Sequence, residues 1–383
     1  MSILNNKQFR DIASQLIVVM ALVLFLWYIT TNLMTNIDQR GITTGFDFFS
    51  NTAGFGISES PIFFDSESTY FRAFLVGLSN TLIVSVVGIF FATVIGVIIG
   101  VSRLSKNYLI SSLATIYVEF FRNIPILLQI LFWYNVVLAA LPSPRASIEL
   151  VFSSFLNNRG LYVPKAIFEN GFLIIFISII VAIAISIFIA KRAKKKFEDT
   201  GKETKILPII LLVLIGIPLF VYNITGGGLS FDNPHLRGFN FVGGMNFSPE
   251  FLALTFALSI YTATYISEAV RSGIEAVPKG QKEAAASLGL TPGKSLRLVV
   301  LPQAIRISIP PIINQYLNLV KNSSLATAIG YPELVTVFSG TVLNQTGQAI
   351  EIIMVTMAVY LTISLSISLL LNYVNKKMEI KGR

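Results

Sequence analysis

The segment LVGLSNTLIVSVVGIFFATVIGVIIGV, residues 75–101, contains no charged side chain and no proline. About 20 consecutive apolar residues are enough for a helix to cross the hydrocarbon core of a bilayer. Comparable apolar runs occur at 12–31, 109–140, 172–190, 206–222, 251–270, 298–320 and 349–372. The sequence therefore predicts an all-α polytopic membrane protein with about eight transmembrane helices.

The composition of the 383-residue chain agrees with this class. Hydrophobic residues make up 54% of the chain and charged residues 13%, with a mean hydropathy of +0.71, whereas soluble domains are about 25% charged. Cysteine is absent and His235 is the single histidine. Disulfides, iron–sulfur clusters, cysteine–zinc sites and multi-histidine metal sites are therefore excluded, and no catalytic constellation can be assembled.

The positive charges predict the orientation. With the N-terminus inside, the inner segments 1–11, 102–108, 191–205, 271–297 and 373–383 hold 20 of the 29 Lys and Arg residues, and the longer outer segments hold 7. Cytoplasmic loops carry such an excess, so both termini are expected in the cytoplasm. Between the last two spans, 323–340 contains Gly330, Pro332 and Gly340 and is expected to be a broken or re-entrant segment.

The segment KEAAASLGLTPGKSLRLVVLP, residues 282–302, lies between the sixth and seventh predicted spans. A DNA-binding helix-turn-helix is excluded because the second element continues directly into a membrane span, away from any major groove. A phosphate loop is excluded because it needs glycine where the chain has Leu288, and a strand before it. The sequence therefore indicates neither a nucleic-acid partner nor an ATP site on this chain.

A short lateral helix, exposed to the cytoplasm, accounts for the same residues. Glu283 is expected near its N-terminus, where the helix dipole favours an anion. Gly289 suits a C-terminal cap with a left-handed backbone, and Pro302 stands where the next membrane helix is established. An apolar face of little bulk, suited to close approach by another protein, is formed by Ala284, Ala285 and Leu288.

EAAASLG, followed after nine residues by VVLP, resembles the EAA loop of ABC-importer permease subunits, with Val299 where that family commonly has isoleucine. In that family, the loop helix sits in a cleft of the ATP-binding subunit and carries nucleotide-driven motion to the membrane helices. The resemblance therefore implies that the chain is coupled to an ATP-binding subunit by Glu283, Ala284, Ala285, Leu288, Gly289 and Pro302.

Further stretches narrow the resemblance. YVEFFRNIPILLQILFWY (117–134) and YLNLVKNSSLATAIGYPEL (316–334) resemble segments of polar amino-acid permeases. An additional N-terminal span and a two-span insertion look like the larger permease subunit of general L-amino-acid importers, whose close relatives take Glu, Gln, Asp and Asn. The predicted parts are 1–74 with the N-terminal span, 75–140 with two core spans, 141–250 as the insertion, and 251–383 with the remaining core.

Two groups of polar residues are candidates for the substrate pathway. Glu119 and Arg122 share a helix face inside a span, with Pro125 able to kink that helix. Arg122 could bind an α-carboxylate, or the two could form a buried ion pair between helices. Lys321 and Asn322, with the hydroxyls of Ser323 and Ser324, stand beside the expected broken segment, where they could contact substrate or cap the seventh span.

The resemblance implies a permease subunit of an ATP-driven amino-acid importer in the bacterial inner membrane. Its expected partners are a second similar permease chain, a dimer of ATP-binding subunits and a periplasmic amino-acid-binding protein, besides the lipid bilayer. Hydrolysis, with its ATP and Mg²⁺, is expected on the partner, so this chain is not itself an enzyme and holds no cofactor. The alternative is an ion-coupled secondary transporter, which would leave the EAA loop unexplained.

Overall fold

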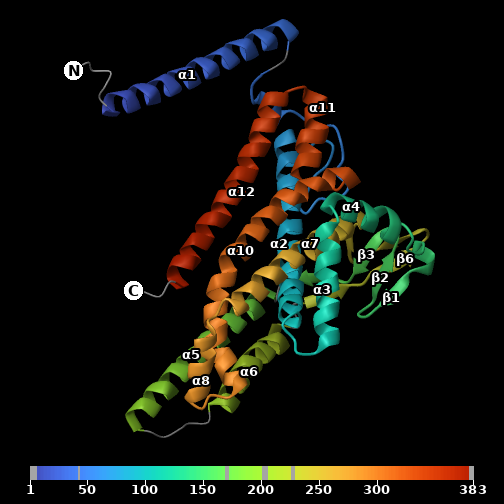
Figure 1. Cartoon of the computed structure of the whole chain (residues 1–383). Coiled ribbons are helices and arrows are strands. Elements are labelled where there is room, and N and C mark those ends of the chain that lie inside the picture. Colours follow the sequence, from blue (N-terminus) through green and yellow to red (C-terminus); the bar gives the residue numbers. More distant parts are fainter. Residues whose placement is uncertain (1–6, 42–43, 169–171, 201–205, 226–228, 379–383) are drawn as a thin grey trace. The chain divides into compact units, whose positions relative to one another are not determined.

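The computed structural model describes residues 7–41, 44–168, 172–200, 206–225 and 229–378 (Figure 1). Parts of the predicted cytoplasmic segments 1–11, 191–205 and 373–383 lie outside these residues. The chain divides into two compact units, one formed by Met1–Ile130 with Thr255–Arg383 and the other by Leu131–Leu254.

Helices dominate the described residues. Seven helical segments are long and apolar enough to cross a membrane, and a bent pair is the eighth. These segments coincide with the eight predicted spans, which confirms a helical polytopic membrane fold. The α-helices are α1 (Lys7–Arg40), α2 (Tyr70–Ser102), α3 (Tyr108–Asn123), α4 (Ile126–Phe132), α5 (Phe172–Thr200), α6 (Leu207–Thr225), α7 (Pro249–Glu275), α8 (Lys279–Ser287), α9 (Pro292–Ser295), α10 (Leu301–Asn322), α11 (Leu343–Thr346) and α12 (Ala349–Met378).

The third predicted span, 109–140, is not one straight helix. It bends by 100° between α3 and the helix that begins with α4, at Pro125, which has no N–H to continue the hydrogen-bond ladder. The buried amide of Gln129 compensates, because its Nε2 donates to the carbonyl oxygens of Phe121 at 2.8 Å and Ile124 at 2.9 Å. The Gln129 side chain therefore stabilises the break in this span.

Small residues bring α2 and α7 into backbone contact in the first unit. A Cβ added at Gly96 would lie 2.6 Å from Ile266, and one at Gly100 would lie 2.7 Å from the carbonyl oxygen of Ser267 and 2.9 Å from Val270 Cβ. Inside a lipid bilayer the hydrophobic effect does not drive helices together. Close van der Waals packing at small residues stabilises such helix pairs instead.

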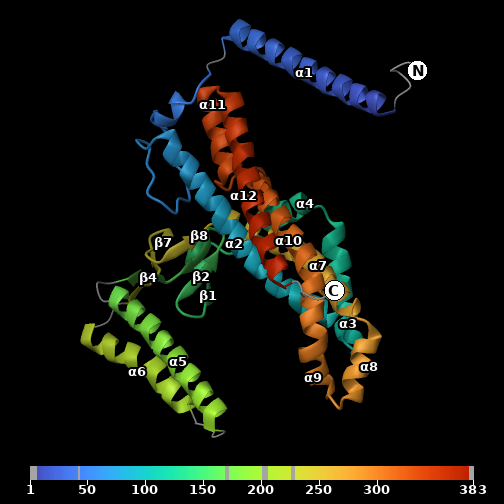
Figure 2. The same cartoon turned by 90° about the vertical axis from the view of Figure 1, so that its left-hand side faces the viewer.

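The segment 323–340 is broken, as predicted. A 3-10 helix over Ser323–Ile329 ends at Gly330, whose φ of +74° is left-handed, and a π-helix follows over Val335–Val342. Together with α11, these short pieces connect α10 to α12 (Figure 2).

A fully buried carboxylate, Glu333, holds this broken segment in place. It accepts hydrogen bonds from the N–H of Thr336 at 2.8 Å, the hydroxyl of Tyr360 at 2.9 Å and the hydroxyl of Thr81 at 3.4 Å. The N–H of Leu334 in turn donates to the Thr81 oxygen at 3.0 Å. The segment is therefore tied to both α2 and α12.

The second unit adds short strands that were not expected from the sequence. The strands β1 to β3 and β8 form a four-stranded antiparallel sheet, and two further antiparallel pairs are β4–β5 and β6–β7. In the same unit α5 and α6 pack side by side (Figure 2). The strands are β1 (Ile148–Leu150), β2 (Ser154–Asn157), β3 (Gly160–Val163), β4 (Lys165–Phe168), β5 (Leu229–Asp232), β6 (His235–Arg237), β7 (Asn240–Val242) and β8 (Met245–Phe247).

Candidate functional site

The lateral helix predicted within 282–302 is α8, and it begins earlier than expected. Pro278 is the residue before the helix, and Lys279 is its first residue. With a φ of −54° and a ψ of +137°, Pro278 is still outside the helix, so the helical backbone begins only at Lys279. Glu283 consequently lies in the middle of α8 rather than in its first turn, so the predicted placement of Glu283 at the N-terminus is wrong.

The apolar face predicted for α8 is divided between two environments. Ala285 is buried, at 3% exposure, and α8 packs against the following π-helical turn over Leu296–Val300. Ala284 and Glu283 are exposed, and Leu288 is 81% exposed. One side of the helix is thus packed against the chain, and the other side is exposed.

The end of α8 has the predicted cap. Gly289 has a φ of +75°. Its N–H donates to the carbonyl of Ala286 at 2.9 Å, and the N–H of Leu290 donates to that of Ala285 at 3.1 Å, the pair of bonds that defines a Schellman motif. Pro302 occupies the first turn of α10, as expected where the next long helix is established.

The base of this loop is rigidly packed. A Cβ at Gly273 of α7 would lie 1.9 Å from Ser308 Oγ of α10, so the two helices touch backbone to side chain. A small apolar cluster closes the base, and its members are Ile274, Val277, Val300 and Ala304. Force applied to α8 would therefore reach both α7 and α10.

A polar cavity of about 280 Å³ lies between α7 and α10 in the first unit. The hydroxyl groups of Tyr261 and Tyr265 are 2.9 Å apart there. All lining side chains are neutral and polar, so the cavity can hold a polar solute through hydrogen bonds without selecting one charge. The lining residues are Tyr261, Thr262, Tyr265, Gln315, Asn318 and Asn322.

Of the four residues singled out around the end of α10, Asn322 lines this cavity. Lys321 is exposed, and it is not among the lining residues. The hydroxyls of Ser323 and Ser324 donate to the backbone carbonyls of Val320 and Lys321, both at 2.7 Å. The serines therefore shape the turn after α10, and the structure does not bring them into the cavity.

Glu119 and Arg122 form a local pair within α3. The distance from Arg122 Nη2 to Glu119 Oε1 is 3.5 Å, and the side chains are 35% and 50% exposed for Arg122 and Glu119, respectively. The pair joins two turns of one helix and is not a buried bridge between helices. The contact from α3 to α7 comes instead from the Tyr117 hydroxyl, which donates to the carbonyl of Ile260 at 2.9 Å.

Five cavity residues were missed in the sequence. Gln315, Asn318 and Asn322 are spaced by three and four residues, and Tyr261 and Tyr265 by four, so each set lies on one helix face. Polar side chains at this spacing inside apolar spans are the signal that would have found them.

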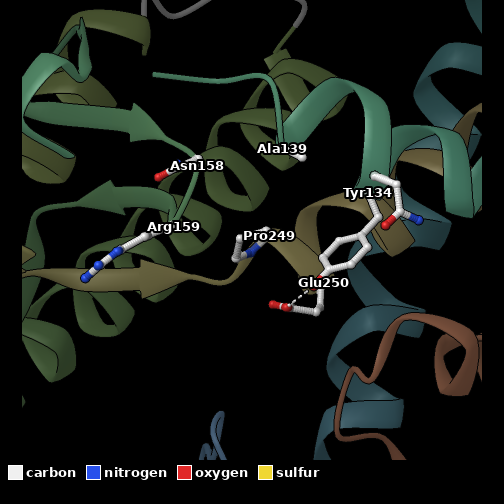
Figure 3. A pocket seen from close by; sticks show the side chains of 7 residues that line it. Tyr134, Ala139, Asn158, Arg159, Pro249 and Glu250 are labelled. Carbon is white, nitrogen blue, oxygen red and sulfur yellow. Dashed lines mark hydrogen bonds between the residues drawn. The ribbon is translucent and has the colours of Figure 1, made fainter. Parts of the chain in front are cut away.

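A second, larger pocket of about 490 Å³ lies in the second unit (Figure 3). Its polar centre is Glu250 at the start of α7, whose carboxylate accepts a hydrogen bond from the Tyr134 hydroxyl at 2.8 Å. Arg159 also lines it, but its guanidinium is directed away from Glu250 (Figure 3). Within the described part of the chain, no three His, Cys, Asp or Glu side chains are grouped as a metal site would require.

Comparison with known proteins places these features in a family. Over its whole length the chain is 50% identical to the general L-amino acid transport system permease protein AapQ of Rhizobium johnstonii, covering 95% of that protein. It is 50% identical to the putative amino-acid ABC transporter permease protein YhdX of Escherichia coli, with 99% and 96% of the two chains aligned.

A third relative has a narrower printed substrate range. The chain is 37% identical to the glutamate/glutamine/aspartate/asparagine transport system permease protein BztB of Rhodobacter capsulatus, with 100% and 96% of the two chains covered. The family model described as binding-protein-dependent transport system inner membrane component matches residues 92–380, a range that includes the α8 loop and the polar cavity. The chain therefore belongs to the family of inner-membrane permease components of binding-protein-dependent transport systems.

Proposed function

We propose that this chain is a transmembrane subunit of an ATP-driven importer of L-amino acids in the bacterial cytoplasmic membrane, with both termini in the cytoplasm. The observation that carries the proposal is α8, a capped helix that presents Glu283 and Leu288 outward from a rigid base between two spans. A dimer of ATP-binding subunits binds this helix and holds the ATP and Mg²⁺. ATP hydrolysis takes place on that dimer, and this chain has no ATPase activity of its own.

The coupling follows from the packing. When the ATP-binding subunits close, they displace α8, with Glu283, Ala284, Leu288 and Gly289 at or next to the contact. Because α7 and α10 touch at Gly273, the displacement moves both helices that line the polar cavity. Ala285 packs α8 against the rest of the loop, and Pro302 lies in the first turn of α10, where the loop ends. Access to the cavity then alternates between the two sides of the membrane.

The lining of the cavity supports a broad substrate range. Its amides and hydroxyls can serve the charged backbone groups that every amino acid carries, and its lining has no charge that would favour acidic or basic side chains. General L-amino acids are therefore the leading substrate class, and the narrower set of Glu, Gln, Asp and Asn is the runner-up. Lys321 and the Glu119–Arg122 pair do not line the cavity, but their exposed positions leave them available to a passing substrate, and we retain them as candidates for the route.

The remaining parts are assigned by position. A second, similar permease chain completes the translocation path, and a periplasmic binding protein delivers the amino acid to the outer loops. Residues 75–140 and 251–383 form the permease core, 1–74 adds a span, and 141–250 is an insertion between core spans. The insertion either shields the core from lipid or widens the platform for the binding protein.

The test is uptake of a panel of labelled amino acids into proteoliposomes that hold the complete transporter. Wild type should import neutral, acidic and basic amino acids only with ATP and the binding protein present. Asn318→Asp should improve the uptake of lysine relative to glutamate by about tenfold, which corresponds to ~1.4 kcal/mol. Asn223→Asp is the matched control, because Asn223 is an exposed asparagine of α6 and does not line the cavity.

Two results would overturn the proposal. Uptake that continues without the ATP-binding subunits would make the chain an ion-coupled carrier. An equal shift in substrate preference for both variants would show that the substrate does not pass through this cavity.

A further inference from the structure

A chain of three ion pairs links the end of α2 to the root of the α8 loop. Arg103, the residue that follows α2, contacts Glu268 of α7 with 2.5 Å between Nη1 and Oε2. The same carboxylate contacts Arg271 at 2.5 Å, and Arg271 contacts Glu275 at 2.5 Å. Glu275 is the last residue of α7, close to the apolar base of the loop.

The first pair differs from the other two in burial. The Arg103 side chain is 12% exposed, whereas that of Glu275 is 50% exposed. The Nε atom of Arg103 is buried and has no acceptor among the described residues, so Glu268 supplies most of the compensation for a shielded charge. Breaking such a pair by removing one partner leaves an uncompensated charge and has large effects.

Arg103 also joins three helices at one point. Its carbonyl oxygen accepts a hydrogen bond from the Ser111 hydroxyl of α3 at 3.0 Å. Its side chain reaches α7 one residue beyond Ser267, against which Gly100 of α2 packs. The glycine contact keeps the two helices close, but a smooth backbone contact resists sliding weakly. A directional ion pair fixes the register of α2 against α7.

We propose that Arg103 is a positioning residue for energy coupling: through Glu268 it makes α2 and the start of α3 move with α7 when a partner displaces α8. The proposal rests on the proposed function of the α8 loop and extends it to a helix outside that loop. Without the pair, α7 and α10 still follow α8, but α2 slips, and ATP is hydrolysed without a complete change of access.

The test is the number of ATP molecules hydrolysed per amino acid imported by the complete transporter in proteoliposomes. Arg103→Gln should keep most ATPase activity and raise this ratio about fivefold or more, the lower end of typical coupling energies. Arg103→Lys should restore most of the coupling, because an ammonium group can still reach Glu268. Arg306→Gln, which removes an exposed charge from α10, should leave the ratio unchanged.

The double variant Arg103→Gln/Glu268→Gln guards against a folding defect, since it removes both charges and leaves none buried and unpaired. It should show the same raised ratio of ATP hydrolysed to amino acid imported as Arg103→Gln. The two effects should not add, because both substitutions remove the same interaction. A wild-type ratio in this assembled double variant, or an equal fall of ATPase and uptake in every variant, would overturn the proposal. Amino-acid uptake by the wild-type transporter in the absence of ATP would instead refute the proposed function.

Discussion

Gly100→Ala tests whether the α2–α7 contact limits the stability of the first unit. Alanine is a better helix former than glycine by about 1 kcal/mol, so propensity alone predicts a gain. At this position, however, the new Cβ would lie 2.7 Å from the carbonyl oxygen of Ser267 and 2.9 Å from Val270 Cβ. The first of these atoms belongs to the backbone, which cannot move aside as a flexible side chain would.

Forced overpacking of this kind costs about 1–3 kcal/mol, which outweighs the propensity gain. Taking the middle of that range, we expect Gly100→Ala to lower the free energy of unfolding by about 1 kcal/mol net, and by up to about 2 kcal/mol if neither helix relaxes. The matched control is Gly216→Ala in α6, because Gly216 is also helical and has no atom within 4 Å of an added Cβ. That variant should be neutral or slightly stabilised.

The measurement is denaturation of the purified transporter by increasing concentrations of sodium dodecyl sulfate in mixed micelles, followed by circular dichroism and by retention of the partner subunits. The sign of the effect should differ between the two glycines. Equal stability of Gly100→Ala and Gly216→Ala would refute the claim that backbone contact at Gly100 holds α2 against α7.

Individual hydrogen bonds and one helix cap can be tested in the same way. Glu333→Ala should lower the free energy of unfolding by about 2–6 kcal/mol, about 1–3 for each buried donor left without its acceptor, namely the Tyr360 hydroxyl and the Thr336 N–H. Glu333→Gln should cost less than half as much in the same denaturation assay, and equal losses would argue against the network. Gln129→Leu should lower the free energy of unfolding by about 2 kcal/mol, because it leaves the carbonyls at the Pro125 bend without a donor. An unchanged stability would mean that the bend does not depend on Gln129. Gly289→Ala forces a side chain into a φ of +75°, which costs about 1–2 kcal/mol, and it should weaken co-purification of the ATP-binding subunits while Gly293→Ala, at an open position, does not.

The transmembrane helices were predictable because each needs a local run of apolar residues, a signal that no distant contact can remove. The cap at Gly289 was predictable for the same reason, since a left-handed helix end depends on the residue itself. Pro125 likewise indicated a kink, but its 100° angle depends on Gln129 reaching back to the freed carbonyls. Local chemistry therefore identified the break without its geometry.

Features built from distant residues were not predictable in this way. Glu333 is held by Thr81, 252 residues away, and by Tyr360, and nothing near Glu333 in the sequence indicates either partner. The strand β3 pairs with β8 across the intervening α5 and α6, so neither short strand shows its partner locally. In the cavity, the spacing of Gln315 and Asn318 was visible, but the helix that they face is set by packing.

The placement of Glu283 shows a third kind of limit. An anion is favoured only within the first turn of a helix, and the sequence around Glu283 did not show that α8 begins as early as Lys279, directly after Pro278. The start at Lys279 moves Glu283 one turn into the helix, onto the exposed side. Its side chain therefore does not stabilise the helix end and is instead available for the contact that we propose with the ATP-binding subunit.

The most direct test of the account is the double variant Glu283→Lys/Gly289→Asp in the reconstituted transporter, with ATP hydrolysis and amino-acid uptake measured together. One change reverses an exposed charge on α8, and the other places a side chain at a left-handed cap. We predict that both activities collapse while the chain still inserts and assembles with its partner permease. Uptake at the wild-type rate would contradict the assignment of α8 as the helix through which ATP drives transport.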